Sequence, residues 1–191
     1  MPRFVCLGLI AVVGSLAAAP VPKALQKQSN YAPLEVGYRW EFSTPDQPDV
    51  VNETREVVSV EVRNGVRYVS QKTSNLVQEF RVTDEGVAVV RVNNREYPSP
   101  RFIVKAGMKA GDSWEWDAGG YKEVRTVGKA EKVTVPAGQF EAVPLTYKTV
   151  QNGQEFSGTT VWYADGVGLV RIDHDGQPSQ VLKAFTKGGK K

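Results

Sequence analysis

The sequence predicts an all-β protein built on one curled antiparallel sheet of about 10–12 strands. From Pro20 onward the chain contains 27 Val against 6 Leu and 2 Ile, and β-branched side chains suit a pleated sheet better than a helix. Short alternating runs of apolar and polar residues are separated by turn residues, the pattern of a β-meander. Because a sheet of this many strands curls or closes, we expect an open or closed barrel-like meander. The alternative is a two-sheet sandwich, which is disfavoured because hairpins dominate and no long Greek-key crossover is evident.

The first half of the chain is predicted to form successive hairpins. Tyr38, Trp40 and Phe42 share one face of the first strand, because successive side chains on a strand point to opposite sides. Asn64-Gly65 is a type I′ turn signal between two further strands. The strands expected after the first cover residues 56–62, 66–73, 76–82 and 87–92.

The longest predicted connection is the stretch 93–110. It contains Pro98 and Pro100, which cannot donate to a ladder. A short strand over 101–105 is the alternative within it.

The second half of the chain resembles the first. The opening Gly37-Tyr-Arg-Trp-Glu-Phe recurs as Gly111-Asp-Ser-Trp-Glu-Trp, and residues 86–92 recur as 166–172. We therefore predict two fused repeats that join into one sheet, since two repeats are too few for a solenoid. The expected single β domain covers 33–186, divided into repeat one (33–100), repeat two (104–175) and a closing hairpin to residue 186.

Residues 1–19 have the features of a secretory signal peptide. Arg3 is followed by 16 uncharged residues that end in Ala17-Ala18-Ala19. This run is shorter than the ~20 residues of a membrane-spanning helix, so no transmembrane span is expected after cleavage. Residues 20–32 are predicted to be a linker and 187–191 a basic tail. The predicted location is exported, periplasmic or extracellular in a bacterium.

Composition excludes several classes of function. The net charge is +3, but without Arg3 and the three lysines of the tail the chain has 20 basic against 21 acidic residues. A nucleic-acid partner is therefore not expected, because a binder carries a basic patch on its fold. The single His174 and single Cys6 leave no cluster for metal binding or for a catalytic triad. We predict no catalytic residues, no metal site and no cofactor.

Three ordered motifs carry a resemblance to a known family. Residues 33–42 (Pro-Leu-x-Val-Gly-x-x-Trp-x-Phe), 135–140 (Val-Pro-Ala-Gly-Gln-Phe) and 162–170 (Trp-Tyr-Ala-Asp-Gly-Val-Gly-Leu-Val) resemble the DUF3108-like group of uncharacterised bacterial exported proteins. The resemblance implies export and an antiparallel β fold, and transfers no catalytic residue. A more distant likeness is to the curved sheets of envelope lipoprotein carriers, which concerns the fold alone.

Aromatic residues are the strongest candidates for a binding site. They fall on strands that the repeat makes equivalent or neighbouring. As ligand-binding candidates we name Tyr38, Trp40, Trp114, Trp116 and Trp162. The alternative is that these rings fill the core.

The sequence favours a non-enzymatic exported β-protein that acts as a binding or scaffold module in the cell envelope. Its expected partner is an envelope protein or an apolar ligand. A second interpretation is a carrier of a lipid or hydrophobic peptide on the concave face of the sheet, which predicts an empty apolar cavity. A third is a carboxylate-dependent hydrolase, for which Glu41 and Glu115 are the acidic residues that recur in matching contexts.

Overall fold

The computed structural model describes residues 30–188, and the regular structure of this part consists of thirteen β-strands. They are β1 (Arg39–Ser43), β2 (Glu53–Arg63), β3 (Val66–Lys72), β4 (Val77–Thr83), β5 (Gly86–Val92), β6 (Arg95–Lys105), β7 (Ser113–Asp117), β8 (Lys122–Val127), β9 (Glu131–Val135), β10 (Gly138–Gln151), β11 (Gln154–Ala164), β12 (Gly168–His174) and β13 (Gln177–Thr186). No helix in this part is long and apolar enough to cross a membrane. The predicted signal peptide and residues 20–29 of the predicted linker lie outside the described residues.

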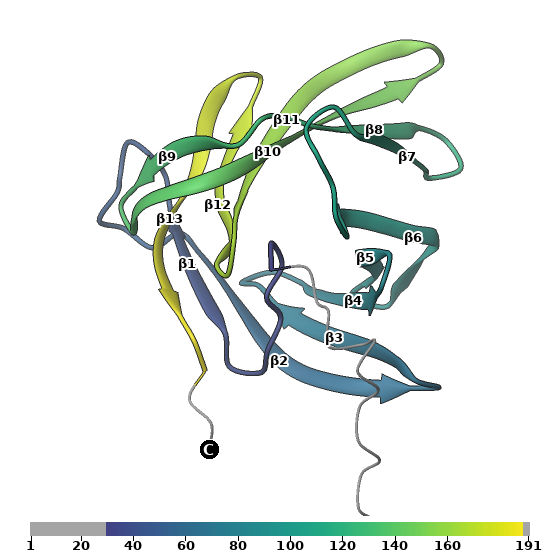
Figure 1. Cartoon of the computed structure of the whole chain (residues 1–191), viewed down its shortest axis with the longest axis horizontal. Coiled ribbons are helices and arrows are strands. Elements are labelled where there is room, and N and C mark those ends of the chain that lie inside the picture. Colours follow the sequence, from purple (N-terminus) through teal and green to yellow (C-terminus); the bar gives the residue numbers. More distant parts are fainter. Residues whose placement is uncertain (1–29, 189–191) are drawn as a thin grey trace, which may run out of the picture.

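All strands belong to one antiparallel sheet that curls into a nearly closed barrel (Figure 1). The strand order is β6-β5-β4-β3-β2-β1-β13-β12-β11-β10-β8-β7, and β9 pairs with β10 alone. The pairing of β1 with β13 joins the two ends of the described chain. The two ends of the strand order, β6 and β7, share no ladder, so one seam of the barrel is open. The predicted all-β curled sheet is confirmed, with one strand more than the upper expectation.

The prediction of a long connection over 93–110 was wrong, because β6 occupies most of it, and the alternative strand over 101–105 is the second half of β6. Its ladder with β5 joins Glu96 to Arg91 and Arg101 to Val89, and the four residues between are left out of register. Pro98 and Pro100 lie in this irregular stretch of an edge strand. Both positions tolerate the missing N–H, which is why proline does not break the strand.

Each half of the barrel repeats the same pairing between its first two strands. In both halves a Glu-x-Arg segment lies opposite the aromatic residues of the opening motif. The pairs are Trp40–Arg55 and Phe42–Glu53 between β1 and β2, and Trp114–Arg125 and Trp116–Glu123 between β7 and β8. Because directly opposed residues face the same side of a sheet, each half places this segment on the side of its opening rings, and the duplication itself stays a prediction.

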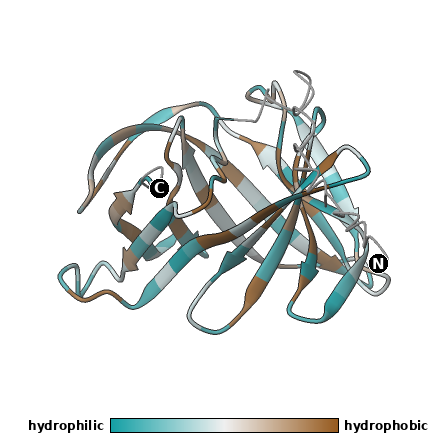
Figure 2. Ribbon diagram, turned by 90° about the horizontal axis from the view of Figure 1, so that it is seen from below, coloured by the Kyte–Doolittle hydropathy of each residue, from teal (hydrophilic) through white to brown (hydrophobic). Residues whose placement is uncertain are grey.

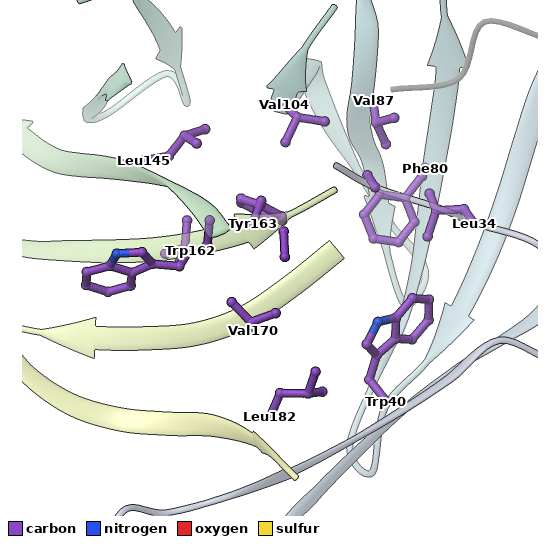
Figure 3. Packing of buried hydrophobic residues seen from close by; sticks show 14 of the residues in the cluster. Leu34, Trp40, Phe80, Val87, Val104, Leu145, Trp162, Tyr163, Val170 and Leu182 are labelled. Atoms are coloured by element: carbon purple, nitrogen blue, oxygen red, sulfur yellow. The ribbon is translucent and has the colours of Figure 1, made fainter. Parts of the chain in front are cut away.

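The core lies on the inner side of the barrel. Hydrophobic and hydrophilic residues alternate along many strands (Figure 2), as expected when one face of a sheet is buried. Phe42, Leu145 and Leu182 are the largest side chains that are almost completely buried. The close-up in Figure 3 shows Leu182 and Val170 near Trp40, with contributions from both halves.

A segment that precedes β1 enters the barrel and packs on the core (Figure 1). Ala32 and Leu34 of this segment are buried, and Leu34 lies beside Phe80 (Figure 3). The Arg67 guanidinium donates a hydrogen bond to the carbonyl of Leu34 at 2.5 Å, and the carbonyl of Asn30 accepts one from the backbone N–H of Gly166 at 2.9 Å. Residues 30–32, which the sequence placed in the linker, are therefore part of the packed domain.

Candidate functional site

A cavity of about 210 Å³ lies inside the barrel, between the inner faces of both halves and the segment that precedes β1. Ten strands contribute residues to its wall. The lining residues are Tyr31, Ala32, Pro33, Leu34, Trp40, Phe42, Arg55, Gln71, Gln78, Phe80, Val89, Arg101, Ile103, Arg125, Tyr147, Val161, Tyr163, Gly168, Leu169 and Ile172. Most of these are apolar, but three are arginines.

Trp40 anchors the apolar part of the cavity wall. Its indole Nε1–H donates a hydrogen bond to the Val167 carbonyl at 2.7 Å, and its ring stacks on Phe185 at 5.3 Å between centroids. Gly168 permits this packing, because a Cβ at that position would lie 3.3 Å from Pro33 and 3.7 Å from the Trp40 indole nitrogen. Its φ of +91° also favours glycine. The Gly-Val-Gly motif therefore shapes the cavity wall.

Two of the three arginines of the wall belong to a cluster behind it that we call the arginine triad, formed by Arg101, Glu123 and Arg125. Arg101 Nη2 donates to Glu123 Oε2 at 2.5 Å, and Arg125 Nε donates to Glu123 Oε1 at 2.6 Å. Arg125 also donates to the Ile103 carbonyl at 3.3 Å. The side chains of Glu123 and Arg125 are only 3% and 4% exposed. Two guanidinium groups thus share one buried carboxylate.

Aromatic rings hold the three arginines of the wall in place. The Arg125 guanidinium lies over the Tyr147 ring at 4.8 Å, and that of Arg101 lies over Trp116 at 5.5 Å. Arg55, in the other half, lies over Phe42 at 4.8 Å. Such contacts are attractive because the face of an aromatic ring is electronegative. They keep the arginines extended along the wall.

The arginines alter the ionisation of their neighbours. Burial acts to raise the pKa of Glu123, but the hydrogen bond from Arg101 and the charges of Arg125 and Arg101 outweigh burial and hold this pKa below its usual value. Burial raises the pKa of the Tyr163 phenol, although the charges of Arg125, Arg55 and Arg101 act in the opposite direction. At neutral pH Glu123 is therefore ionised and Tyr163 keeps its proton.

The lowered pKa of Glu123 predicts a specific loss of stability in acid. Because the pKa is lower in the folded chain than in the unfolded chain, the stabilisation is complete above the unfolded value of about 4.3 and is lost as the pH falls through the folded value. Glu123→Gln should therefore be less stable than the wild type at pH 7, and this difference should narrow below about pH 4. Urea denaturation from pH 7 to pH 3 measures both chains. If the difference in free energy of unfolding between the two chains stays constant over this range, Glu123 does not have a lowered pKa in the folded chain.

Side chains bridge the open seam between β6 and β7. The indole Nε1–H of Trp114 donates to the Phe102 carbonyl at 3.2 Å, and that of Trp116 donates to the Ser99 carbonyl at 3.0 Å. Tyr97 packs on Trp116 with ring centroids 5.0 Å apart. Carbonyl groups at the edge of β6 thus find donors on β7 side chains in place of a backbone ladder.

The predicted ligand-binding residues occupy three different places. Trp40 alone among them lines the cavity, while Tyr38 makes an edge contact with it, 6.3 Å between ring centroids. Trp114 and Trp116 lie at the seam. Trp162 follows the alternation of β11 and points away from the side of Tyr163; its indole donates to Glu131 at 2.6 Å and its ring lies under Arg171. The five aromatic residues do not share one concave face, because Trp162 points to the other face of β11 and the curl of the sheet separates β1 from β7.

Sequence reasoning missed the arginines and glutamines of the cavity wall, which are Arg55, Arg101, Arg125, Gln71 and Gln78. Charged residues on strands were assumed to face solvent, as on most half-exposed sheets. A usable signal existed, since Glu-x-Arg follows the aromatic opening of each half. Alternation then places the carboxylate and the guanidinium on one face of their strand. The cross-strand pairing puts them beside the buried rings of the preceding strand.

The acid and base candidates of the hydrolase interpretation do not converge. Glu41 pairs with Arg39 at 3.1 Å, and Glu115, 62% exposed, lies 3.6 Å from Lys122. His174 is exposed and its Nδ1 lies 3.0 Å from the Thr159 hydroxyl. Within residues 30–188 no group of three or more His, Cys, Asp or Glu could hold a metal ion.

Comparison with known proteins supports the fold. The profile of the DUF3108-like family matches residues 121–176, which include two of the three motifs that carry the resemblance. A candidate exported protein with a YmcC-like fold from Bacteroides fragilis is 15% identical, with a TM-score of 0.50 over 82% of this chain and 99% of that chain. A candidate lipoprotein from Parabacteroides distasonis is also 15% identical, with a TM-score of 0.49 over 84% of this chain and 100% of that chain. Among curated proteins no sequence match is found.

Proposed function

We propose that this chain is an exported binding protein of the bacterial cell envelope that takes an apolar ligand inside its barrel. The observation that carries the proposal is the internal cavity of about 210 Å³, walled by rings and aliphatic side chains from both halves. Apolar concave sites with a few well-placed polar groups are typical of ligand pockets. The cavity is smaller than the ~300–1,000 Å³ of most such pockets, which favours a small or slender ligand.

The outer surface gives less support to a scaffold role. A scaffold of this kind should expose an aromatic or apolar patch, yet all four tryptophans are buried. Tyr121 and Phe156 are the exposed aromatic residues of the described part, and the other exposed large apolar side chains there are valines. Single exposed apolar residues are normal for a protein surface. The described surface therefore offers no aromatic patch to a scaffold partner.

The chemistry of the cavity wall supports binding over hydrolysis. Within residues 30–188 the wall presents guanidinium, amide, phenol and indole groups to the cavity, and no carboxylate, thiol, imidazole or aliphatic hydroxyl. These are groups that orient a ligand by hydrogen bonds and stacking. A hydrolase would need a nucleophile or a general base within hydrogen-bond reach of the bound substrate.

Export is the second part of the proposal. It rests on the charge-free run that ends in Ala17-Ala18-Ala19 and on the exported protein of the same fold in Bacteroides fragilis. The full chain expressed in a bacterium should lose its first 18–24 residues on export, since small residues precede the cleavage point. N-terminal sequencing of the exported product tests this. An intact Met1 in the membrane fraction would contradict it.

Ligand binding is tested by displacement of a fluorescent fatty acid from the purified chain. We expect saturable binding at one site, and a loss of at least tenfold in affinity for Leu169→Trp, because a bulky ring would occupy the cavity. Val58→Trp, at an exposed position of β2, is the matched control and should bind as the wild type does. Equal affinity for all three chains would show that the probe binds outside the cavity.

The same preparations test the hydrolase interpretation against a panel of ester, amide and glycoside substrates. Glu41→Gln, Glu115→Gln and His174→Ala remove the best acid and base candidates. Each should change the free energy of unfolding by less than about 0.5 kcal/mol, since all three residues make surface contacts. Turnover that disappears in one of these variants would replace the binding function with an enzymatic one.

A further inference from the structure

The two halves of the barrel differ in the charge that they present to the cavity. In the first half Arg55 pairs one-to-one with Glu53 at 2.5 Å, and the neutral amide of Gln180 on β13 completes the cluster. In the second half the corresponding pair is Glu123 and Arg125, and the group that completes the cluster is the charged Arg101 of β6 in place of a neutral amide. The arginine triad therefore has two positive charges and one negative charge. Glu123 and Arg125 are buried and 23% of the Arg101 side chain is exposed. Charges in such surroundings are normally balanced, so the triad lacks one anion.

The arginine triad also has hydrogen-bond donors to spare. A guanidinium has five N–H donors. Arg101 uses Nε and Nη2 on Glu123, and Arg125 uses Nε on Glu123 and Nη1 on the Ile103 carbonyl. For Arg101 Nη1 and Arg125 Nη2, no hydrogen-bond partner exists among residues 30–188, and both side chains line the cavity. Two N–H groups that carry positive charge are thus available to a ligand.

A third donor comes from β11, which pairs with the edge of β10 that β8 does not pair with. Tyr163 on β11 lines the cavity, and the positive charges of Arg125, Arg55 and Arg101 act on its phenol. Because the phenol stays protonated at neutral pH, its O–H can donate to an anion. Charge-assisted hydrogen bonds are about twice as strong as neutral ones.

We propose that the ligand is a single-chain amphiphile with a carboxylate head, bound with its head at Arg101, Arg125 and Tyr163 and its chain along the apolar wall. This inference rests on the proposed function and names the class of ligand. A carboxylate supplies the missing charge, and its two oxygens suit the open N–H groups of two guanidiniums. A chain of the fatty-acid type suits a cavity of about 210 Å³, which is too small for a lipid with two acyl chains.

The test compares decanoate, decanol and decyl phosphate with the purified full-length chain by isothermal titration calorimetry at pH 7.5. Decanol has the same chain length without the charge, so the ratio of the two affinities isolates the head. We expect decanoate to bind at least tenfold more tightly than decanol, because a charge-assisted hydrogen bond contributes more than a neutral one. Decyl phosphate should bind more weakly than decanoate, since its larger head carries more charge than the triad lacks.

Single substitutions test whether the carboxylate head of the ligand binds at Arg101 and Tyr163. Arg101→Gln should reduce the affinity for decanoate about tenfold, and Tyr163→Phe should reduce it severalfold. Both variants should leave the affinity for decanol unchanged. Arg39→Gln removes an arginine of the outer face and should change neither affinity. Tyr163→Phe removes one hydroxyl alone, so it keeps the test informative if Arg101→Gln does not fold.

The outcomes separate the two proposals. Equal affinities for decanoate and decanol, or variants with no effect on their ratio, would overturn the carboxylate head while binding inside the barrel stands. Tighter binding of decyl phosphate would also overturn it, in favour of a phosphate head. Absence of binding by all three compounds would contradict the proposed function itself.

Discussion

Trp40→Ala is expected to lower the free energy of unfolding by about 3–5 kcal/mol, the cost of truncating a large buried ring. Trp40 stacks on Phe185, donates a hydrogen bond to the Val167 carbonyl, and lines the cavity that the truncation would enlarge. Urea denaturation followed by circular dichroism measures the loss. Because the hydrogen bond is a small part of the effect, Trp40→Phe should lose clearly less than Trp40→Ala.

The same experiment on Trp114 tests the duplication. Trp114 is the second residue of β7, as Trp40 is of β1, and each lies opposite an arginine of the following strand. Trp114→Ala should therefore also cost about 3–5 kcal/mol. A loss below about 1 kcal/mol for either residue would mean that the two positions are not equivalent.

Glu123→Ala is the second change with a large expected effect, a loss of about 3–5 kcal/mol of stability at pH 7. Removal of one partner from a buried ion pair leaves an uncompensated charge, and here two guanidinium groups lose their shared carboxylate. The stability measurement is again urea denaturation. Glu115→Ala, on the neighbouring strand but exposed, is the matched control and should stay within about 0.5 kcal/mol of the wild type.

A double variant distinguishes the lost charge pair from lost packing. Glu123→Ala with Arg125→Met removes the carboxylate and one of the two buried positive charges, while Met keeps much of the arginine stem in place. It should recover a large part of the stability lost in Glu123→Ala, because an apolar side chain can replace a buried charge at little cost. If the losses of stability in Glu123→Ala and Arg125→Met simply add in the double variant, the uncompensated buried charge does not cause the loss in Glu123→Ala.

The sequence predicted the fold class because its signals are local. Valine content, alternation and the Asn64-Gly65 turn all act within a few residues, and each leads to the observed hairpins. The first half of β6 was missed for a non-local reason. Pro98 and Pro100 are tolerated only because their strand lies at the edge of the sheet and is locally out of register with β5. The burial of Leu34 was also missed for a non-local reason, because Leu34 packs against strands that follow it in the sequence.

The candidate site was predicted less well than the fold. The sequence singled out the aromatic residues as a set, but their distribution over a wall, a seam and an outer face depends on how far the sheet curls. The arginine triad depends on contact between β6 and β8, which lie on opposite sides of the seam. Arg101 and Glu123 are 22 residues apart in the sequence. No alternation within one strand predicts that contact. The Glu-x-Arg recurrence does predict that Glu123 and Arg125 share a face.

The seam connects the fold to the proposed function. Arg101 belongs to both, since it lines the cavity and joins β6 to Glu123 of β8 across the gap in the ladder. An acidic ligand at Arg101 therefore contacts the same side chain that holds the two edges of the sheet together. Bound ligand should stabilise the folded chain by mass action, and the stabilisation should depend on Arg101.

The most direct test of the account is mass spectrometry of what co-purifies with the chain when it is isolated, under native conditions, from the bacterium that encodes it. We expect an amphiphile with one acyl chain and a carboxylate head, present at close to one molecule per chain. The amount should fall at least tenfold in Leu169→Trp, which fills the cavity, and should be unchanged in Val58→Trp, which does not. A chain that carries no acyl compound, or the same amount in all three proteins, would contradict ligand binding inside the barrel.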